Sequence, residues 1–197
     1  SILFENNYRK IYIGFSNGAI LQYNAGNGSL IKTVNEVYNI KDKTQNNYKY
    51  YSHNKDISGL YYYHRPNDEN ILISTSYDSF INIFNEKNTE ISEQIKTIKG
   101  GHSNKKKNYE ILCMNFSETL NIFSTSGTDG IIVLWDFEFS KPFHVFSIID
   151  NSEYKINATF LKFLEPFPIL ASSNSDGTFY LFEIYKEPNK SKCILRA

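Results

Sequence analysis

The sequence predicts an all-β protein, and three observations lead to that prediction. Ile, Tyr, Phe and Thr are plentiful, whereas Ala occurs only five times in 197 residues. β-branched and aromatic residues favour strands, and a shortage of Ala disfavours helices. One segment, made of two apolar strands joined by a tight turn, recurs four times along the chain. Further strand signals precede and follow every copy of this segment.

The recurring segment begins with an apolar strand and continues through a turn that carries Asn or Asp. A second apolar strand follows, and an aromatic and a polar residue close it. The copies occupy residues 11–24, 72–85, 123–136 and 170–183. The turn residue always precedes the closing aromatic by six positions, from 17 to 23, 78 to 84, 129 to 135 and 176 to 182. Four copies with the same spacing indicate an internal repeat.

Two further strands flank each copy. An aromatic residue that would end a preceding strand lies 13, 16, 13 and 13 residues before the turn; these residues are Phe4, Tyr62, Phe116 and Phe163. A weaker apolar pattern follows each copy, for example at 95–98 and 143–148. Each repeat is therefore predicted to be a four-stranded antiparallel meander. The predicted repeats cover residues 1–34, 53–98, 110–148 and 157–197, with a polar linker or insertion at 35–52.

These residues resemble the WD40-repeat family of β-propellers. The third repeat carries the most complete signature, with Gly101-His102 before its first strand, Asp129-Gly130 in its turn and Trp135-Asp136 at its end. The turn residues recur 61, 51 and 47 positions apart, against roughly 40–45 for a WD40 repeat. The other repeats close with Tyr23-Asn24, Phe84-Asn85 and Phe182-Glu183. The resemblance implies about four propeller blades.

Rings of this family usually contain more blades, so the resemblance implies a partial propeller. The remaining blades are expected from the same longer chain or from another chain. A weaker similarity links residues 135–140 and 163–170 to blades of large WD-repeat proteins that also carry EF-hands. The sequence contains no calcium-binding loop of the EF-hand type.

Several polar residues of the third repeat could be mistaken for a catalytic set. In the WD40 family, the residues at the positions of His102, Thr125, Asp129 and Trp135 form a buried hydrogen-bond network, called a hydrogen-bond staple below. Such a network is rigid when every member has a partner. Partial staples are expected in two other repeats, from His53, Ser74 and Asp78, and from Ser172 and Asp176. The resemblance therefore implies structural residues and no catalytic residue.

Composition and motifs argue against several functions. The 21 Lys and Arg residues balance 21 Asp and Glu residues, so no basic excess favours nucleic acid or an anionic membrane. Cys113 and Cys193 are expected to be free thiols. No phosphate loop, nucleophile elbow or metal-spaced His pair occurs, so no cofactor, metal or enzymatic activity is expected. The sequence lacks a long apolar run and signal-peptide features, which predicts a cytoplasmic location, with a cytoskeletal or ciliary one as a variant.

Two segments are candidates for binding a partner protein or peptide. The linker presents Tyr48, Tyr50 and Tyr51, and tyrosine is favoured at interface hot spots. The alternative for this segment is an insertion without a binding role. The loop after His102 carries the run Lys105, Lys106 and Lys107. That run is either a solvated loop or a surface that attracts an acidic partner.

Three classes of function remain open from the sequence. The leading hypothesis is a non-catalytic WD40 scaffold that mediates protein–protein interactions in a multiprotein assembly. The first alternative is a structural spacer within a large cytoskeletal or ciliary WD-repeat protein. The second alternative is a propeller enzyme whose site lies outside these residues, because no cluster of titratable groups is apparent in the sequence.

Overall fold

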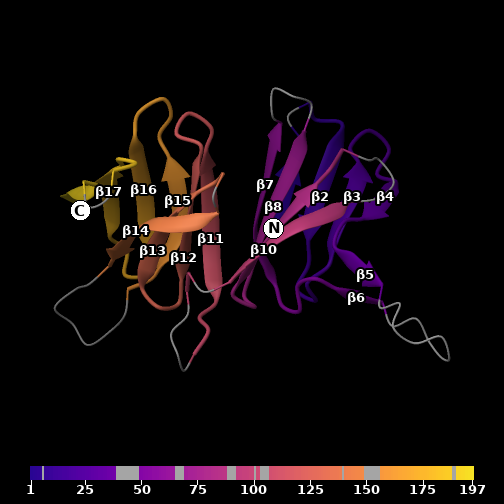
Figure 1. Ribbon diagram of the computed structural model, residues 1–197, viewed down its shortest axis with the longest axis horizontal. Coiled ribbons are helices and arrows are strands. Elements are labelled where there is room, and N and C mark those ends of the chain that lie inside the picture. Colours follow the sequence, from indigo (N-terminus) through magenta and orange to yellow (C-terminus); the bar gives the residue numbers. More distant parts are fainter. Residues whose placement is uncertain are drawn as a thin grey trace. The chain divides into compact units, whose positions relative to one another are not determined.

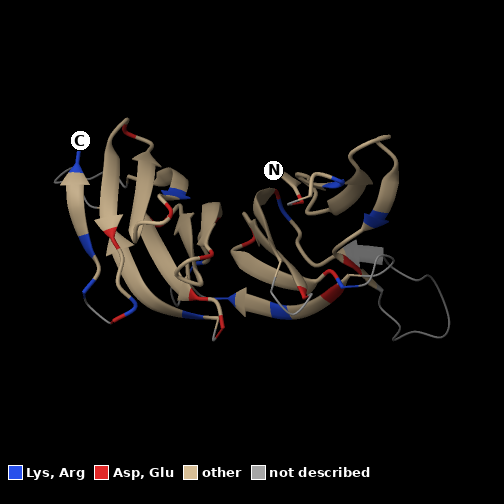
Figure 2. Ribbon diagram, turned by 90° about the horizontal axis from the view of Figure 1, so that it is seen from above, with Lys and Arg blue, Asp and Glu red and all other residues tan. Residues whose placement is uncertain are grey.

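A computed structural model describes residues 1–5, 7–38, 49–64, 69–87, 92–99, 101–102, 107–138, 140–148, 156–187 and 190–197. The regular secondary structure of these residues consists of β-strands alone (Figure 1). The chain divides into two compact units, Ser1–Thr97 and Ile98–Ala197. Acidic and basic residues are interspersed along the ribbon of both units (Figure 2). In the described ranges no helix has the length and apolar character needed to cross a bilayer.

The first unit contains two four-stranded sheets and a small strand pair. The first sheet has the order β1 (Ile2–Phe4), β2 (Lys10–Gly14), β3 (Ile20–Asn24) and β4 (Leu30–Thr33). The second sheet has the order β10 (Glu93–Lys99), β9 (Phe80–Asn85), β8 (Asn70–Ser76) and β7 (Ile57–His64). The last two residues of β10 belong to the second unit. Between the sheets in sequence, β5 (Glu36–Tyr38) pairs with β6 (Lys49–Tyr51).

The second unit contains two more sheets of the same kind. One has the order β11 (Ile111–Ser117), β12 (Ile122–Gly127), β13 (Ile131–Asp136) and β14 (Lys141–Ser147). The other has the order β15 (Ala158–Phe163), β16 (Ile169–Asn174), β17 (Phe179–Glu183) and β18 (Lys192–Arg196). Strands adjacent in sequence pair antiparallel within each sheet. The predicted fold class, an all-β chain of four-stranded antiparallel meanders, is therefore confirmed.

Each sheet falls close to one of the predicted repeats. The four sheets span residues 2–33, 57–99, 111–147 and 158–196. The turn between the second and third strand of three sheets has a glycine with positive φ, at Gly18, Gly130 and Gly177. In the remaining sheet, Ser79 takes this position with φ 76°. The Asn or Asp of each turn is thus followed by a residue with left-handed backbone conformation. Short hairpins commonly contain such a residue, which follows a type I turn and forms a G1 bulge.

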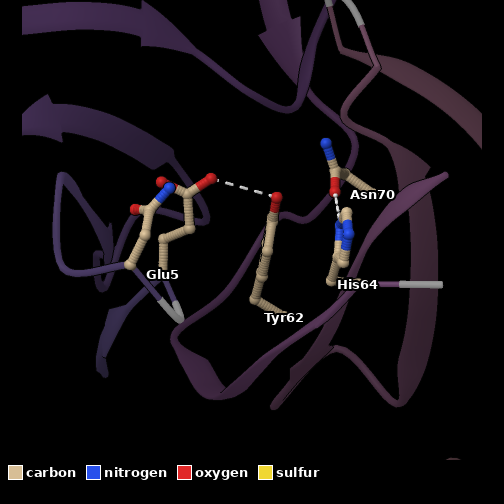
Figure 3. Close-up of a pocket in the computed structure, with 5 residues that line it drawn as sticks. Glu5, Tyr62, His64 and Asn70 are labelled. Atoms are coloured by element: carbon tan, nitrogen blue, oxygen red, sulfur yellow. Dashed lines mark hydrogen bonds between the residues drawn. The ribbon is translucent and has the colours of Figure 1, made fainter. Parts of the chain in front are cut away.

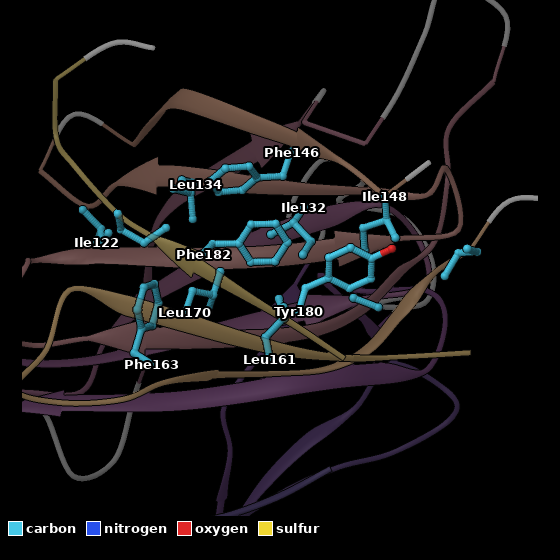
Figure 4. Packing of buried hydrophobic residues seen from close by; sticks show 13 residues of the cluster. Ile122, Ile132, Leu134, Phe146, Ile148, Leu161, Phe163, Leu170, Tyr180 and Phe182 are labelled. Atoms are coloured by element: carbon cyan, nitrogen blue, oxygen red, sulfur yellow. The ribbon is translucent and has the colours of Figure 1, made fainter. Parts of the chain in front are cut away.

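The core of the second unit lies between its two sheets (Figure 4). Ile132 and Leu134 of β13 are fully buried and belong to the same apolar cluster as Leu161 of β15. The rings of Phe146 and Phe182 meet with their centroids 4.3 Å apart. Large buried side chains from facing sheets of this kind supply the main stabilisation of a sheet sandwich.

The core of the first unit is smaller and includes polar groups. Tyr12 of β2 stacks on Tyr62 of β7, with ring centroids 5.8 Å apart and an interplanar angle of 27°. Leu72 and Phe84 of the second sheet complete the cluster from the β8 and β9 side. Both tyrosines are buried, so their hydroxyl groups need hydrogen-bond partners inside the protein.

Burial along the strands follows the position of each strand in its sheet. In β13, the residues from Ile132 to Trp135 are all buried, so both faces of this strand are covered. β9 shows the same pattern. By contrast, β10 and β18 are largely exposed edge strands. Continuous apolar runs in the inner strands and open outer strands match the arrangement of propeller blades.

Candidate functional site

The third sheet contains a closed hydrogen-bond staple. The His102 Nδ1 atom lies 3.0 Å from Oδ1 of Asp129, and its Nε2 atom lies 2.8 Å from Oγ1 of Thr125. The indole Nε1 of Trp135 donates to the same Thr125 oxygen over 2.8 Å. The structure thus joins all four residues that the WD40 resemblance indicates. Their hydrogen bonds form one continuous series from the turn to the end of β13.

The donors and acceptors of this staple are consistent with one another. Because a carboxylate can only accept, the His102 Nδ1–H donates to Asp129. The His102 Nε2 atom then accepts the Thr125 hydroxyl proton, and Thr125 in turn accepts the Trp135 indole N–H. His102 and Thr125 are 1 % and 0 % exposed. Both ring nitrogens are occupied within the protein, so this histidine is not available to a substrate as a general base.

Two glycines make room for the staple. A Cβ atom at Gly101 would lie 2.1 Å from Cζ2 of Trp135. A Cβ atom at Gly127 would lie 2.5 Å from Nδ1 of His102 and 2.8 Å from Oδ1 of Asp129. Side chains at either position would push the ring atoms out of hydrogen-bond geometry. Gly127 was not singled out by the sequence, because only the folded geometry reveals the close approach.

The second sheet holds a similar network with a different closing group. The His53 Nδ1 atom lies 2.9 Å from Oδ2 of Asp78, and Nε2 lies 2.8 Å from Oγ of Ser74. The sequence predicts an open end at Phe84, which has no N–H to donate. The structure instead places the Asn82 amide 3.2 Å from Nε2 of His53. Asn82 was missed because it lies two residues before the expected position.

The carboxyl group of Asp78 has a pKa below its usual value. Burial alone would raise this pKa, but the hydrogen bond and charge of His53 lower it, together with backbone N–H groups of Phe80 and Asn54. The side chain of Asp78 is 3 % exposed. Asp78 is therefore held as a carboxylate that organises the turn between β8 and β9.

The other two sheets lack a histidine-centred network. Ser172 donates to Asn174 over 3.2 Å, whereas Asp176 is exposed and accepts bonds from the backbone N–H and hydroxyl of Thr178. The sequence predicts a partial staple that contains Ser172 and Asp176. In the structure these two residues bond to other partners, because no histidine bridges the distance between them. In the first sheet, Asn35 replaces the staple by accepting from the Ile20 N–H and donating to Gly18 O.

The candidate partner-binding residues are only partly described. Tyr48, Lys105 and Lys106 lie outside the described residues. Tyr50 and Tyr51 belong to β6, and the side chain of Tyr51 is half-buried. The exposed Lys107 places its Nζ atom 5.2 Å from the centroid of the Tyr109 ring. Tyr51 belongs to the first unit and Lys107 to the second.

The first unit contains a pocket that the sequence did not indicate (Figure 3). Its lining residues are Glu5, Asn7, Tyr62, His64 and Asn70. Glu5 and Tyr62 are separated by 57 positions in the chain but are joined by a hydrogen bond of 3.1 Å. No local motif signals this pairing, because it depends on how two sheets of the unit face each other.

Groups suited to metal or thiol chemistry are scarce in the described residues. No cluster of three or more His, Cys, Asp or Glu side chains suited to a metal ion occurs there. Cys113 and Cys193 are both free cysteines. Burial raises the pKa of the Cys113 thiol to about 11, which keeps it protonated and unreactive near neutral pH.

The comparisons with known proteins point to one family. Residues 92–136 match the family model described as WD domain, G-beta repeat. The matched segment runs from β10 to the end of β13 and includes all four residues of the complete staple. A search of curated proteins gave no match. The resemblance to WD40 repeats is thus confirmed, while the similarity to EF-hand-containing WD-repeat proteins stays a prediction.

Proposed function

Because this chain carries a WD40 repeat among four four-stranded antiparallel sheets, we propose that it is a non-catalytic scaffold that mediates protein–protein interactions in a multiprotein assembly. The observation that carries the proposal is the closed staple of the third sheet. Its acid, imidazole, hydroxyl and indole groups are all bonded to one another and buried. These groups therefore serve to rigidify the turns, and a rigid framework of this kind supports binding loops.

Exposed apolar sheet faces support a second part of the proposal. In the first sheet, Phe4, Ile11, Tyr23 and Leu30 form a paired row, and Phe4 and Leu30 are 48 % and 55 % exposed. In the last sheet, Phe160, Ser173 and Phe179 form a row whose aromatic members are 58 % and 40 % exposed. Paired residues share a face of the sheet, and apolar faces of this kind mark interaction surfaces.

We propose that further propeller blades cover these two faces. Each face carries exposed apolar side chains on its strands. Within each unit, two sheets already pack against each other through buried apolar side chains in the same way. The blades would come from the same longer chain or from another chain. The location proposed for this scaffold is cytoplasmic, with a cytoskeletal or ciliary location as its variant.

The scaffold proposal is tested by purifying the tagged full-length protein from its source cells under mild cross-linking. A scaffold retains a small set of partners in fixed stoichiometric amounts. The spacer alternative instead predicts cross-links to many neighbours without any high-affinity partner. An activity screen of the same purified protein addresses the enzyme alternative, and turnover that survives removal of the co-purifying proteins would contradict the proposal.

A further inference from the structure

The pocket of the first unit lies at one end of its strands and has a volume of about 310 Å³. Glu5 follows β1, Tyr62 and His64 end β7, and Asn70 begins β8 (Figure 3). The His53–Asp78 network lies at the opposite end of β8. One wall of the pocket is therefore carried by β8, whose other end is fixed by hydrogen bonds. A volume near 300 Å³ suits one long side chain or a small molecule.

Glu5 is a buried carboxylate with one unused oxygen. Its Oε1 atom accepts the Tyr62 hydroxyl over 3.1 Å and forms an ion pair with Nζ of Lys10 at 3.8 Å, which is longer than a hydrogen bond. Its Oε2 atom is buried and has no hydrogen-bond partner among the described residues. The side chain of Glu5 is 8 % exposed. A carboxyl oxygen in such a place calls for a donor, because a buried polar atom without a hydrogen bond is unfavourable.

The same shortage of donors extends behind the pocket wall. Tyr62 stacks on Tyr12, whose hydroxyl donates to Oε2 of Glu86 over 3.2 Å. Lys32 forms a buried ion pair with the same Glu86 oxygen at 3.0 Å. Nevertheless, Oε1 of Glu86 and Oε1 of Gln22 have no hydrogen-bond partner within the described ranges. Acceptors thus outnumber donors throughout this contact between the two sheets.

The pKa values of the two tyrosines agree with this picture. Burial raises the pKa of Tyr62, and the nearby carboxylate of Glu5 raises it further. Burial also raises the pKa of Tyr12, with Glu86 as the next cause. Both phenols therefore stay protonated and donate to the carboxylates. An anionic ligand would be repelled by Glu5, whereas a group that brings N–H donors and positive charge would complete the site.

We propose that this pocket binds the cationic end of an Arg or Lys side chain from a protein partner, with Glu5 as its charge partner. The Glu5 carboxyl group supplies the negative charge that attracts the guanidinium or ammonium group. The amide groups of Asn7 and Asn70 at the pocket provide further polar contacts, and Asn70 is held because its Oδ1 accepts a 2.6 Å hydrogen bond from Nδ1–H of His64. This inference rests on the proposed scaffold function and names the chemistry of one partner contact.

The test uses small probes of defined charge on the full chain. N-acetyl-arginine N-methylamide and its lysine counterpart are titrated into ¹⁵N-labelled protein, and backbone amide signals around Tyr62 and Asn70 are followed. N-acetyl-citrulline N-methylamide has nearly the same shape as the arginine probe but no charge. Saturable shifts with both cationic probes and none with the citrulline probe are expected. Equal binding of the citrulline probe would overturn the proposal.

Two variants locate the site. Glu5→Gln removes the charge with little change in shape and should weaken the cationic probes about tenfold or more, because the charge that attracts the cation is lost. Glu187→Gln makes the same change at an exposed position and should leave binding unchanged. Asn7→Arg alters an exposed residue of the pocket and supplies a competing guanidinium, so a correctly folded variant should no longer bind the probes. Unaltered binding by both pocket variants would refute the assignment.

Two comparisons separate this inference from the scaffold function. Peptides with a central Arg should bind more tightly than n-butylguanidine, because a partner chain adds contacts outside the pocket; equal affinity would overturn the assignment to a protein side chain. Partner recovery is then compared between wild-type protein and Glu5→Gln. If the same partners are retained by the variant in full amounts, the pocket inference fails while the scaffold function stands. If the wild-type protein retains none, the scaffold function fails whatever the probes show.

Discussion

At the scale of single residues, the stability of the third sheet depends on a network of four side chains in which every hydrogen-bonding group has a partner. Asp129 is the acceptor at the start of this network and also accepts from the Ile131 N–H over 3.4 Å. Removing one member leaves the next one buried and unpaired, and this penalty exceeds the net value of the hydrogen bond itself.

We therefore expect Asp129→Ala to lower the free energy of unfolding by about 2–3 kcal/mol. The loss arises because the His102 ring N–H is left without an acceptor in the interior. Urea denaturation followed by tryptophan fluorescence measures the change, since Trp135 is the only tryptophan. Asp176→Ala, at the equivalent turn position but exposed, is the control and should shift the midpoint little. A midpoint for Asp129→Ala equal to the wild type would contradict the structural role.

Asp78 adds a pH dependence at the same scale. Its pKa in the folded protein lies below the ordinary value of 3.8, so its ionised form stabilises the fold. This stabilisation is fully present above the unfolded pKa and is lost as the pH falls through the lower folded pKa. Asp78→Asn should therefore be less stable than the wild type at pH 7, and the difference should shrink towards pH 2. Denaturation curves at several pH values measure it, and a difference that is constant with pH would rule this out.

Asn82 offers a third test of the networks. Its amide nitrogen bonds His53 Nε2 and the Ser52 hydroxyl, while its oxygen accepts the Thr97 hydroxyl over 2.8 Å. Asn82→Ala should reduce the free energy of unfolding by about 1–3 kcal/mol because several buried groups lose their partner. Asn85→Ala, on the same strand but half-buried at its end, is the matched control. Equal stability of the two variants would show that Asn82 does not close the network.

At the scale of elements, inner and outer strands of one sheet contribute differently. Val133 of β13 and Val145 of β14 are direct cross-strand partners, yet they are 1 % and 49 % exposed. The contrast arises because β13 is covered on both faces, whereas β14 is the last strand of its sheet. Two valines that are partners across neighbouring strands therefore lie in different environments, one buried and one half-exposed.

This pair allows a matched prediction. Val133→Ala should reduce the free energy of unfolding by about 2 kcal/mol, because it removes buried methyl groups and leaves a cavity. Val145→Ala makes the identical change at a half-exposed site and should reduce it by much less. Thermal or urea unfolding measures both. Similar losses for the two variants would mean that β14 is covered in solution by another surface.

The elements could be predicted from the sequence to a large extent, and the networks only in part. The constant spacing from the turn residue to the closing aromatic located the second and third strands of every sheet, since that spacing reflects hairpin geometry. The roles of Asn82, Asn35 and Gly127 could not be predicted, because their partners lie far away in sequence or approach only after folding. The pocket was missed for the same reason: Glu5 and Tyr62 belong to different sheets.

At the scale of the whole molecule, the exposed apolar rows of the first and last sheets dominate the expected behaviour in solution. Ile2, Phe4 and Leu30 belong to one sheet, and Phe160 and Phe179 to the other, and all are more than one third exposed. Apolar surface of this kind promotes association when no covering partner is present.

We expect the isolated 197-residue chain to self-associate at micromolar concentration. Phe160→Lys should shift the sedimentation profile towards the 22.9 kDa monomer without a loss of stability, because the side chain lies outside the core. Val145→Lys, which alters an exposed apolar residue away from these rows, should leave association unchanged. A wild-type chain that sediments as a stable monomer at all concentrations would contradict the expectation that further blades cover these faces.

The offset between the sequence repeat and the sheet has a practical consequence for dividing the polypeptide. The matched WD40 segment starts at residue 92, just before β10, yet β10 pairs with β9 in the preceding sheet. A deletion made at the repeat boundary would therefore strip the second sheet of its edge strand and expose the backbone hydrogen-bonding groups of β9. A cut placed directly after residue 99 leaves every sheet with four strands and keeps His102 on the same segment as Thr125 and Asp129.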